Sequence, residues 1–155
     1  MPISLTRRAA LRLSAAGALA LGAAPAFAQT AAIPATVTEP VEITFYNYNL
    51  SSAGNGAEAT KKMIAEFEAA HPNIKVTGVP VAPQSLMTRI QADLVAGQPV
   101  DLSQMGFMGI DFAVQNLGAV ALEDIIPAEE LDAHFEGMVP NGLELGRLDG
   151  KTWGL

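Results

Sequence analysis

Aromatic and amide side chains alternate directly after a predicted strand, and they are the residues of this chain best suited to binding chemistry. Tyr46, Asn47, Tyr48 and Asn49 follow one another there. An aromatic face packs against the C–H surface of a ring, and an amide donates hydrogen bonds to hydroxyl groups and accepts them. We therefore predict that Tyr48 and Asn49 contact a small polar ligand. A tyrosine that points inward would instead pack at the strand end.

A second polar pair stands at the start of a predicted helix. Gln84 and Ser85 precede its apolar positions, where backbone N–H groups have no partner within the helix. Such an end either holds an oxyanion or hydroxyl group of a ligand or is capped by its own polar side chains. We predict ligand contact for Gln84, with helix capping as the alternative.

The residue types that catalysis requires are sparse and scattered. The sequence has no Cys, its two histidines, His71 and His134, stand far apart, and no metal-ligand spacing is present. Ser51 and Ser52 lack the glycine pattern of a nucleophile elbow. We predict that the chain has no catalytic residue and no metal site, and that it is not an enzyme.

A glycine-rich loop at residues 54–59 fits the spacing G-x-G-x-x-A of a dinucleotide-binding turn. The same residues also fit a helix start, because Asn55 is followed three positions later by Glu58, as in a capping box. No acidic residue ends the next strand, where Val79 and Pro80 stand. We therefore favour helix capping and predict no bound cofactor.

These candidate residues depend on strands and helices that alternate along the chain. Hydrophobic periodicity predicts strands at 41–46, 74–79 and 100–105, with helices at 57–70 and 83–96. Pro72 ends the first helix, and Gly97 suits the position after the second. This order predicts an α/β fold with a mostly parallel sheet flanked by helices. Because ligands bind such sheets at the carboxyl ends of strands, function is expected in the loops after Tyr46, Val79 and Met105.

Local patterns also predict how the remaining elements are placed. The helix at 57–70 carries Met63, Ile64 and Phe67 on one apolar face. Further on, we expect a short helix ended by Gly118, a tight turn at Asp149 and Gly150, and four smaller pieces. Those pieces are an extended segment at 120–122, an exposed helical turn at 129–132, a weak helix within 135–145 and a strand that begins at 151.

The N-terminal residues have the pattern of an export signal. Arg7, Arg8 and Arg12 form a basic region, residues 13–22 are apolar, and small residues flank Phe27 before a cleavage point after residue 28. We predict a signal peptide at 1–28 and a flexible leader at 29–40. The paired arginines also resemble a twin-arginine signal, so the Sec and twin-arginine routes both remain open.

Charge limits the class of partner. Removal of residues 1–28 takes away three of the nine Lys and Arg residues and none of the 16 acids, so the mature chain carries a formal charge of −10. An acidic surface argues against binding to nucleic acids or anionic membranes. We expect a periplasmic, monomeric protein without a nucleic-acid partner.

Several segments, in their order and spacing, resemble the extracellular solute-binding proteins of bacterial ABC importers, carbohydrate-binding type (family 1). The matching segments are 43–47, 64–68, 71–76, 94–101, 118–124 and 150–155. One departure is Val100, which separates Pro99 from Asp101 where the family has Pro and Asp adjacent.

The resemblance implies a periplasmic-binding-protein-like fold of type II, with two lobes and the ligand between them. Residues 41–155 would then form an incomplete N-terminal lobe of a longer protein. The alternative is a complete small domain. In this family the segment after the third strand contacts ligand, which implies roles for Gln104, Gly106 and Phe107. Phe107 would stack on a sugar ring or simply pack, and Trp153 would belong to the core.

The resemblance also implies a function. The protein would capture a sugar, polyol or related small polar solute and deliver it to the membrane permease subunits of an ABC importer. One alternative is a binding protein for glycerol 3-phosphate or glycerophosphodiesters, although the candidate loops carry no Arg or Lys for a phosphate. A more distant alternative is an exported α/β hydrolase.

Overall fold

The computed structural model of this chain describes residues 37–155. The predicted signal peptide at 1–28 and most of the leader at 29–40 lie outside the described residues. The helices are α1 (Asn55–Ala70), α2 (Leu86–Val95), α3 (Ile110–Asn116), α4 (Ala128–Phe135) and α5 (Pro140–Leu145). The strands are β1 (Val41–Asn47), β2 (Ile74–Pro80), β3 (Leu102–Ser103), β4 (Arg147–Leu148) and β5 (Lys151–Thr152). No helix in this described part is long and apolar enough to cross a membrane.

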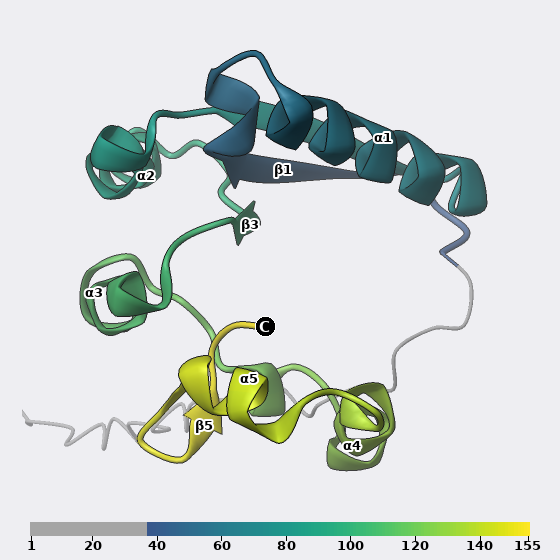
Figure 1. The fold of residues 1–155 in the computed structure, drawn as a ribbon, viewed down its shortest axis with the longest axis vertical. Helices are drawn as coiled ribbons and strands as arrows, with labels where there is room; N and C mark the ends of the chain where they lie inside the picture. The colour runs from purple at the N-terminus through teal and green to yellow at the C-terminus, as the bar shows by residue number, and fades with distance from the viewer. Residues whose placement is uncertain (1–36) are drawn as a thin grey trace, which may run out of the picture.

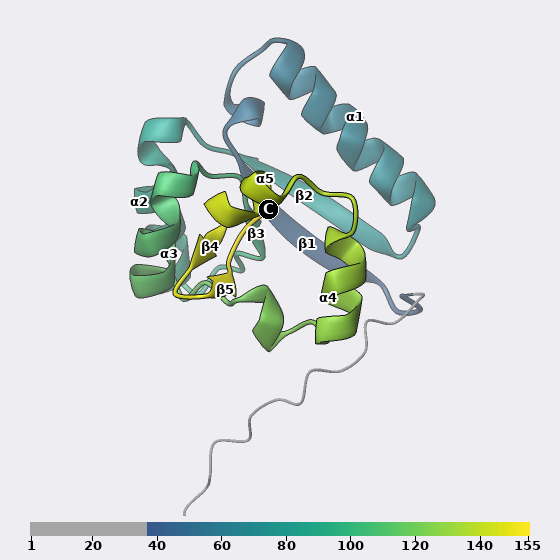
Figure 2. The same cartoon turned by 60° about the horizontal axis from the view of Figure 1, so that its bottom comes forward.

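The main sheet is parallel and has the order β2-β1-β3. β1 and β2 pair along their whole length, from Val41 opposite Ile74 to Asn47 opposite Pro80. In Figures 1 and 2, α1 runs beside these strands, while α4, α5 and the β4-β5 hairpin lie on the other side of the sheet. The prediction of an α/β fold with a parallel sheet is therefore confirmed.

The third strand is shorter than predicted, because a side chain replaces part of its ladder. β3 pairs with β1 at two positions, whereas the sequence pattern predicted a strand over 100–105. Ahead of it, the Thr44 N–H and the Thr44 hydroxyl donate to Asp101 Oδ2 at 2.8 and 2.7 Å. The Asp101 N–H donates in return to the Thr44 hydroxyl at 3.1 Å. This clamp holds the segment around Val100 against β1 without a regular backbone pairing.

The Asp101 clamp gives an expected pH dependence. Hydrogen bonds from the Thr44 N–H and hydroxyl lower the pKa of Asp101 below its ordinary value. Because the folded pKa is the lower one, the clamp stabilises the fold fully above the unfolded pKa and is lost as pH falls through the folded pKa. We expect Asp101→Asn to cost about 1 kcal/mol or less at pH 7, since the carboxylate is exposed and screened.

Urea unfolding of the wild type and Asp101→Asn at pH 7, 5 and 3 measures this effect. The difference between the two proteins should shrink toward pH 3. Asp132→Asn, a change of an exposed acid on α4, is the matched control and should leave the pH profile unchanged. A difference for Asp101→Asn that stays constant across this range would contradict the expectation.

The face that α1 presents to the sheet differs from the predicted one. Ala57 and Thr60 are buried, whereas Met63 is 59% exposed and Phe67 is also exposed. Thr60 accepts a hydrogen bond from Asn49 Nδ2 in the loop after β1, and the half-buried Ile64 is the α1 residue nearest Gly78 of β2. The expectation that Met63 and Phe67 belong to the buried face was wrong.

The predicted cap of α1 is also absent. The helix already begins at Asn55, and Gly54 is the N-cap residue, with φ at 140° and no side-chain cap bond. That backbone conformation favours glycine. The capping-box interpretation of Asn55 and Glu58 was therefore wrong, since Asn55 lies within the first turn.

The core lies where β1 meets α2. Tyr46, Val81, Leu86 and Ile90 form a buried cluster. Tyr46 is thus the tyrosine that points inward, and its hydroxyl donates to Asp93 Oδ2 at 2.8 Å. Burial and this hydrogen bond raise the pKa of Tyr46, while the neighbouring guanidinium of Arg89, on the same helix, holds the pKa of Asp93 below its usual range.

The C-terminal part is organised by a hairpin. β4 and β5 pair antiparallel around Asp149 and Gly150, whose positive φ angles of 51° and 78° confirm the predicted tight turn. In the segment at 120–122, Ala121 has the predicted extended backbone, but a 3-10 turn (Leu122–Asp124) begins at the last residue. α4 is longer than the predicted exposed turn at 129–132, since Leu131 is buried and fixes one face of the helix.

Candidate functional site

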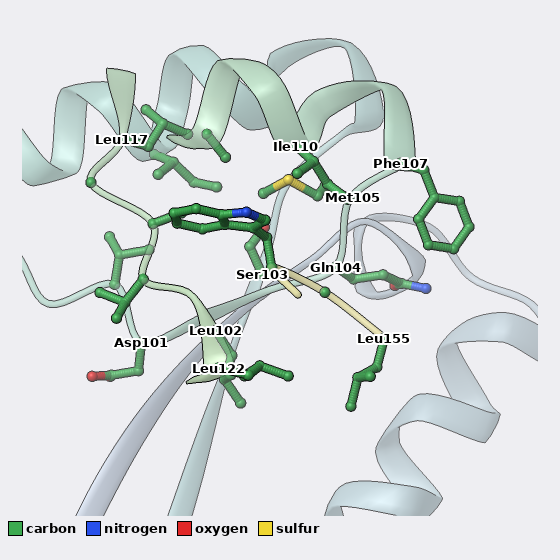
Figure 3. Close-up of a pocket in the computed structure, with 18 of the residues that line it drawn as sticks. Asp101, Leu102, Ser103, Gln104, Met105, Phe107, Ile110, Leu117, Leu122 and Leu155 are labelled. Carbon is green, nitrogen blue, oxygen red and sulfur yellow. The ribbon is translucent and has the colours of Figure 1, made fainter. Parts of the chain in front are cut away.

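A pocket of about 670 Å³ opens beside β3, between α3 and the end of the β4-β5 hairpin. Its walls are mostly apolar and come from four parts of the chain: Ile90 of α2, residues 100–105 with Phe107, α3 with the segment after it as far as Ile125, and 153–155. Figure 3 shows Met105, Ile110 and Leu117 along one part of it. Asp101 is the acidic residue among the lining side chains, and it is already engaged by Thr44.

Two of the predicted ligand residues meet at this pocket. The Gln104 N–H donates to the Tyr46 carbonyl at 2.8 Å, which fixes Gln104 at the carboxyl end of β1. Gln104 Oε1 is buried and has no hydrogen-bond partner within the described residues. Phe107 is 46% exposed, and Figure 3 places its ring on the same side of the pocket as Gln104 and Leu155. An exposed aromatic face and an unpaired amide oxygen are groups that can bind a polar ring.

Gly106, the third residue predicted in this segment, lies between them in the sequence but does not line the pocket. It is exposed, with φ at −71°, and it precedes a 3-10 turn (Phe107–Gly109). A side chain there would meet no atom within 4 Å. The pocket therefore does not require a glycine at this position for space.

Ser103 is a pocket residue that the sequence analysis missed. Its hydroxyl is buried and lacks a hydrogen-bond partner in the described part of the chain. A signal existed, because alternate residues of a strand share one side, and Ser103 stands two positions from both Asp101 and Met105. A buried hydroxyl without a partner is costly unless a water or ligand reaches it.

Trp153, which the resemblance assigned to the core, is half-buried and lines the pocket. Its Nε1–H donates to the Leu148 carbonyl at 3.0 Å, so the ring is held by the hairpin. The carboxylate of Glu123 accepts the Thr152 N–H at 2.9 and 3.0 Å, which ties the hairpin to the preceding turn. Burial opposes the charged form of Glu123, but these hydrogen bonds outweigh it and lower its pKa.

The other predicted residues lie at the same end of the sheet but outside this pocket. Tyr48 is half-buried and packs against the cluster around Tyr46. Asn49 is half-buried, and its Nδ2 donates to the Thr60 hydroxyl at 3.5 Å. Gln84 is exposed in a 3-10 turn (Pro83–Ser85), with no side-chain cap bond there. The structure thus brings Gln104 and Phe107 together and leaves Tyr48, Asn49 and Gln84 on neighbouring loops.

The arrangement is suited to binding. Among the described residues, no group of three His, Cys, Asp or Glu side chains is placed to hold a metal ion. His71 stacks against Phe67, with ring centroids 4.6 Å apart, and lies at the opposite end of β2 from the candidate loops. None of the residues that line the pocket is Lys or Arg. What the pocket offers is apolar surface, one exposed aromatic ring and buried polar oxygens.

Comparison with known families decides the assignment. The sequence profile of the bacterial extracellular solute-binding proteins matches residues 53–134, more than half of the chain. This chain belongs to that family. For this solute-binding protein the resemblance drawn from sequence segments is therefore confirmed. No curated protein matches the sequence.

Solved structures agree with the family at the level of fold. CpMnBP1 with mannotriose bound has a TM-score of 0.60 at 20% identity, over 74% of this chain and 28% of that one. The galacto-N-biose-/lacto-N-biose I-binding protein of the ABC transporter from Bifidobacterium longum has a TM-score of 0.60 at 19% identity, over 77% of this chain and 29% of that one. A family 1 extracellular solute-binding protein from Alicyclobacillus acidocaldarius has a TM-score of 0.60 at 23% identity, over 77% of this chain and 28% of that one.

The fold of this solute-binding protein is therefore periplasmic-binding-protein-like, of type II. The chain spans less than a third of the length of these structures. Their ligands are properties of those proteins and do not by themselves identify the solute that this chain binds.

Proposed function

We propose that this protein is the periplasmic substrate-binding component of an ABC importer, which captures a sugar or related small polar solute and delivers it to a membrane permease. The observation that carries the proposal is the pairing of Phe107 with the unpartnered amide oxygen of Gln104 at the carboxyl end of the sheet. Family membership supports it, and so do structural neighbours whose names include mannotriose and lacto-N-biose.

In this proposal, residues 41–155 are an incomplete N-terminal lobe, and the second lobe closes over the ligand. The chain's short span against its structural neighbours supports this division. Gln104, Gly106 and Phe107 would meet the solute from one loop, with Tyr48, Asn49 and Gln84 from the two neighbouring loops. The protein would act as a monomer without cofactor, nucleic acid or catalysis, and residues 1–28 would direct its export by the Sec or twin-arginine route.

The two other functions considered from the sequence gain no support. A phosphate ester calls for Arg or Lys at the site, and none lines the pocket. A hydrolase calls for a nucleophile with a positioned base, and neither described histidine, His71 or His134, lies at the pocket.

Thermal unfolding of the full-length mature protein in the presence of candidate solutes tests the proposal. The panel contains mannobiose, mannotriose, lacto-N-biose, maltose, glycerol and glycerol 3-phosphate. A ligand present at 100 times its Kd stabilises the folded state by about 2.7 kcal/mol, so a true solute raises Tm clearly. We expect a saccharide to do so without being turned over. A shift with glycerol 3-phosphate alone, or product formation from a glycoside, would contradict the proposed function.

A further inference from the structure

The outer strand of the main sheet, β2, presents one edge that no described strand pairs with. Its orientation follows from two hydrogen bonds of the β1-β2 ladder. The Val41 N–H donates to the Asn73 carbonyl, and the Val81 N–H donates to the Asn47 carbonyl. Alternate residues of a strand direct their backbone groups to the same side, so odd-numbered residues of β2 pair with β1. The free edge therefore belongs to the even-numbered residues Ile74, Val76, Gly78 and Pro80.

Three of the four backbone positions along this edge offer no free N–H to a second strand. The Ile74 N–H donates to the His71 carbonyl at 2.9 Å. The Val76 N–H donates to Glu68 Oε1, a side chain of α1, at 2.8 Å. Pro80 has no N–H to offer. At Gly78 the Leu50 side chain covers the face of the strand, because an added Cβ would stand 2.6 Å from its Cδ1. A Cβ points out of the sheet plane, so the edge between Val76 and Pro80 depends on the neighbouring Glu68.

Glu68 also forms an ion pair with Lys75, and this pair spans the free edge of β2. α1 covers the face of β2 that carries the even-numbered side chains, as Ile64 Cδ1 would lie 3.8 Å from a Cβ at Gly78. Lys75 leaves the strand toward the opposite face. Its Nζ nevertheless reaches Glu68 Oε1 at 2.9 Å. The pair from Lys75 to Glu68 therefore crosses the strand edge and places charge where another strand would dock.

We propose that Glu68 closes the β2 edge against strand pairing with a second copy of this chain. An exposed edge strand carries unpaired N–H and C=O groups that a strand of another molecule can pair with. A charged side chain held on the edge is a known means of blocking such pairing. A second copy is the partner that fits, because the same edge on both molecules has the same alternation of N–H and C=O groups. This role is independent of ligand capture and concerns solubility of the folded protein.

Glu68→Ala in the full-length mature protein tests the proposal by two measurements. Hydrogen exchange reports on the Val76 amide, and size-exclusion chromatography with light scattering reports on association. We expect exchange at Val76 to become about tenfold faster or more, while the Thr77 and Val79 amides that pair with β1 stay protected. We also expect a concentration-dependent dimer. Glu66→Ala is the matched control, since Glu66 lies on the same helix and pairs with Lys62 at the surface.

Two further variants separate edge closure from loss of fold. Glu68→Gln keeps an oxygen that can accept from Val76 but loses the charge and the ion pair with Lys75, so it should associate less than Glu68→Ala. Pro80→Ala adds one N–H at the other end of the edge, leaves Glu68 in place, and should increase dimer formation in the Glu68→Ala protein. The proposal is overturned if Glu68→Ala stays monomeric at all concentrations, or if Glu66→Ala and Glu68→Gln associate as strongly.

Discussion

Replacing Phe107 with Ala is expected to weaken solute binding by about tenfold or more, which corresponds to about 1.4 kcal/mol. The ring is half-exposed at the pocket and faces the side where the Gln104 amide lies. An aromatic face loses its contact with a ring-shaped ligand when it is truncated to a methyl group, and aromatic anchors at binding sites carry effects of this size. Isothermal titration with the saccharide found in the screen measures the change in Kd.

The neighbouring residue provides a control of similar size. Met108 is fully exposed and does not line the pocket, so Met108→Ala should leave Kd unchanged. Both variants should unfold near the wild-type Tm without ligand, because neither side chain is buried. Equal Kd values for Phe107→Ala and Met108→Ala would show that the Phe107 ring does not contact the solute.

Replacing Ile90 with Ala is expected to lower the free energy of unfolding by about 2–5 kcal/mol. Ile90 is 2% exposed and packs with Tyr46, Val81 and Leu86 where α2 meets β1. The loss combines the removed apolar contact with the cavity left behind, and it is large against the total stability of about 5–15 kcal/mol of a folded domain. Urea unfolding followed by circular dichroism measures it.

This core also supports the site. Ile90 lines the pocket, and Tyr46 holds Gln104 through the carbonyl that accepts the Gln104 N–H. We therefore expect weaker ligand binding in Ile90→Ala as well as lower stability. Val95→Ala, at an exposed position of the same helix, should change stability by no more than about 0.5 kcal/mol. A loss below about 1 kcal/mol for Ile90→Ala would show that this cluster is not the core.

The sequence by itself determined the order and type of the main elements. The alternation in 41–46 and 74–79, the stop at Pro72 and the turn at Asp149 and Gly150 are local signals, set by backbone sterics and by side-chain spacing over a few residues. The observed strands β1 and β2 and the β4-β5 hairpin follow them closely. The solute-binding family was also readable, because its signature is the order of such local segments.

Only the tertiary structure decided which side chains those elements bury. Met63 and Phe67 are more apolar than Ala57 and Thr60, yet the smaller pair is buried. The third residue of the predicted apolar face, Ile64, is half-buried and lies nearest Gly78 of β2. Likewise, sequence could not choose between Tyr46 and Tyr48 as the inward ring. That choice depends on Asp93, which is distant in sequence and receives the hydroxyl of Tyr46.

The candidate site divides in the same way. Gln104 and Phe107 were predicted because the resemblance places ligand contacts after the third strand, at the carboxyl end of the sheet where ligands are expected. Trp153 was not predicted at the site, because its place depends on the hairpin, which the hydrogen bonds of Glu123 to Thr152 tie to the turn at Leu122–Asp124. Periodicity reports which face of an element is apolar. The contacts that turn such faces into a pocket join residues far apart in the chain, and they exist only after folding.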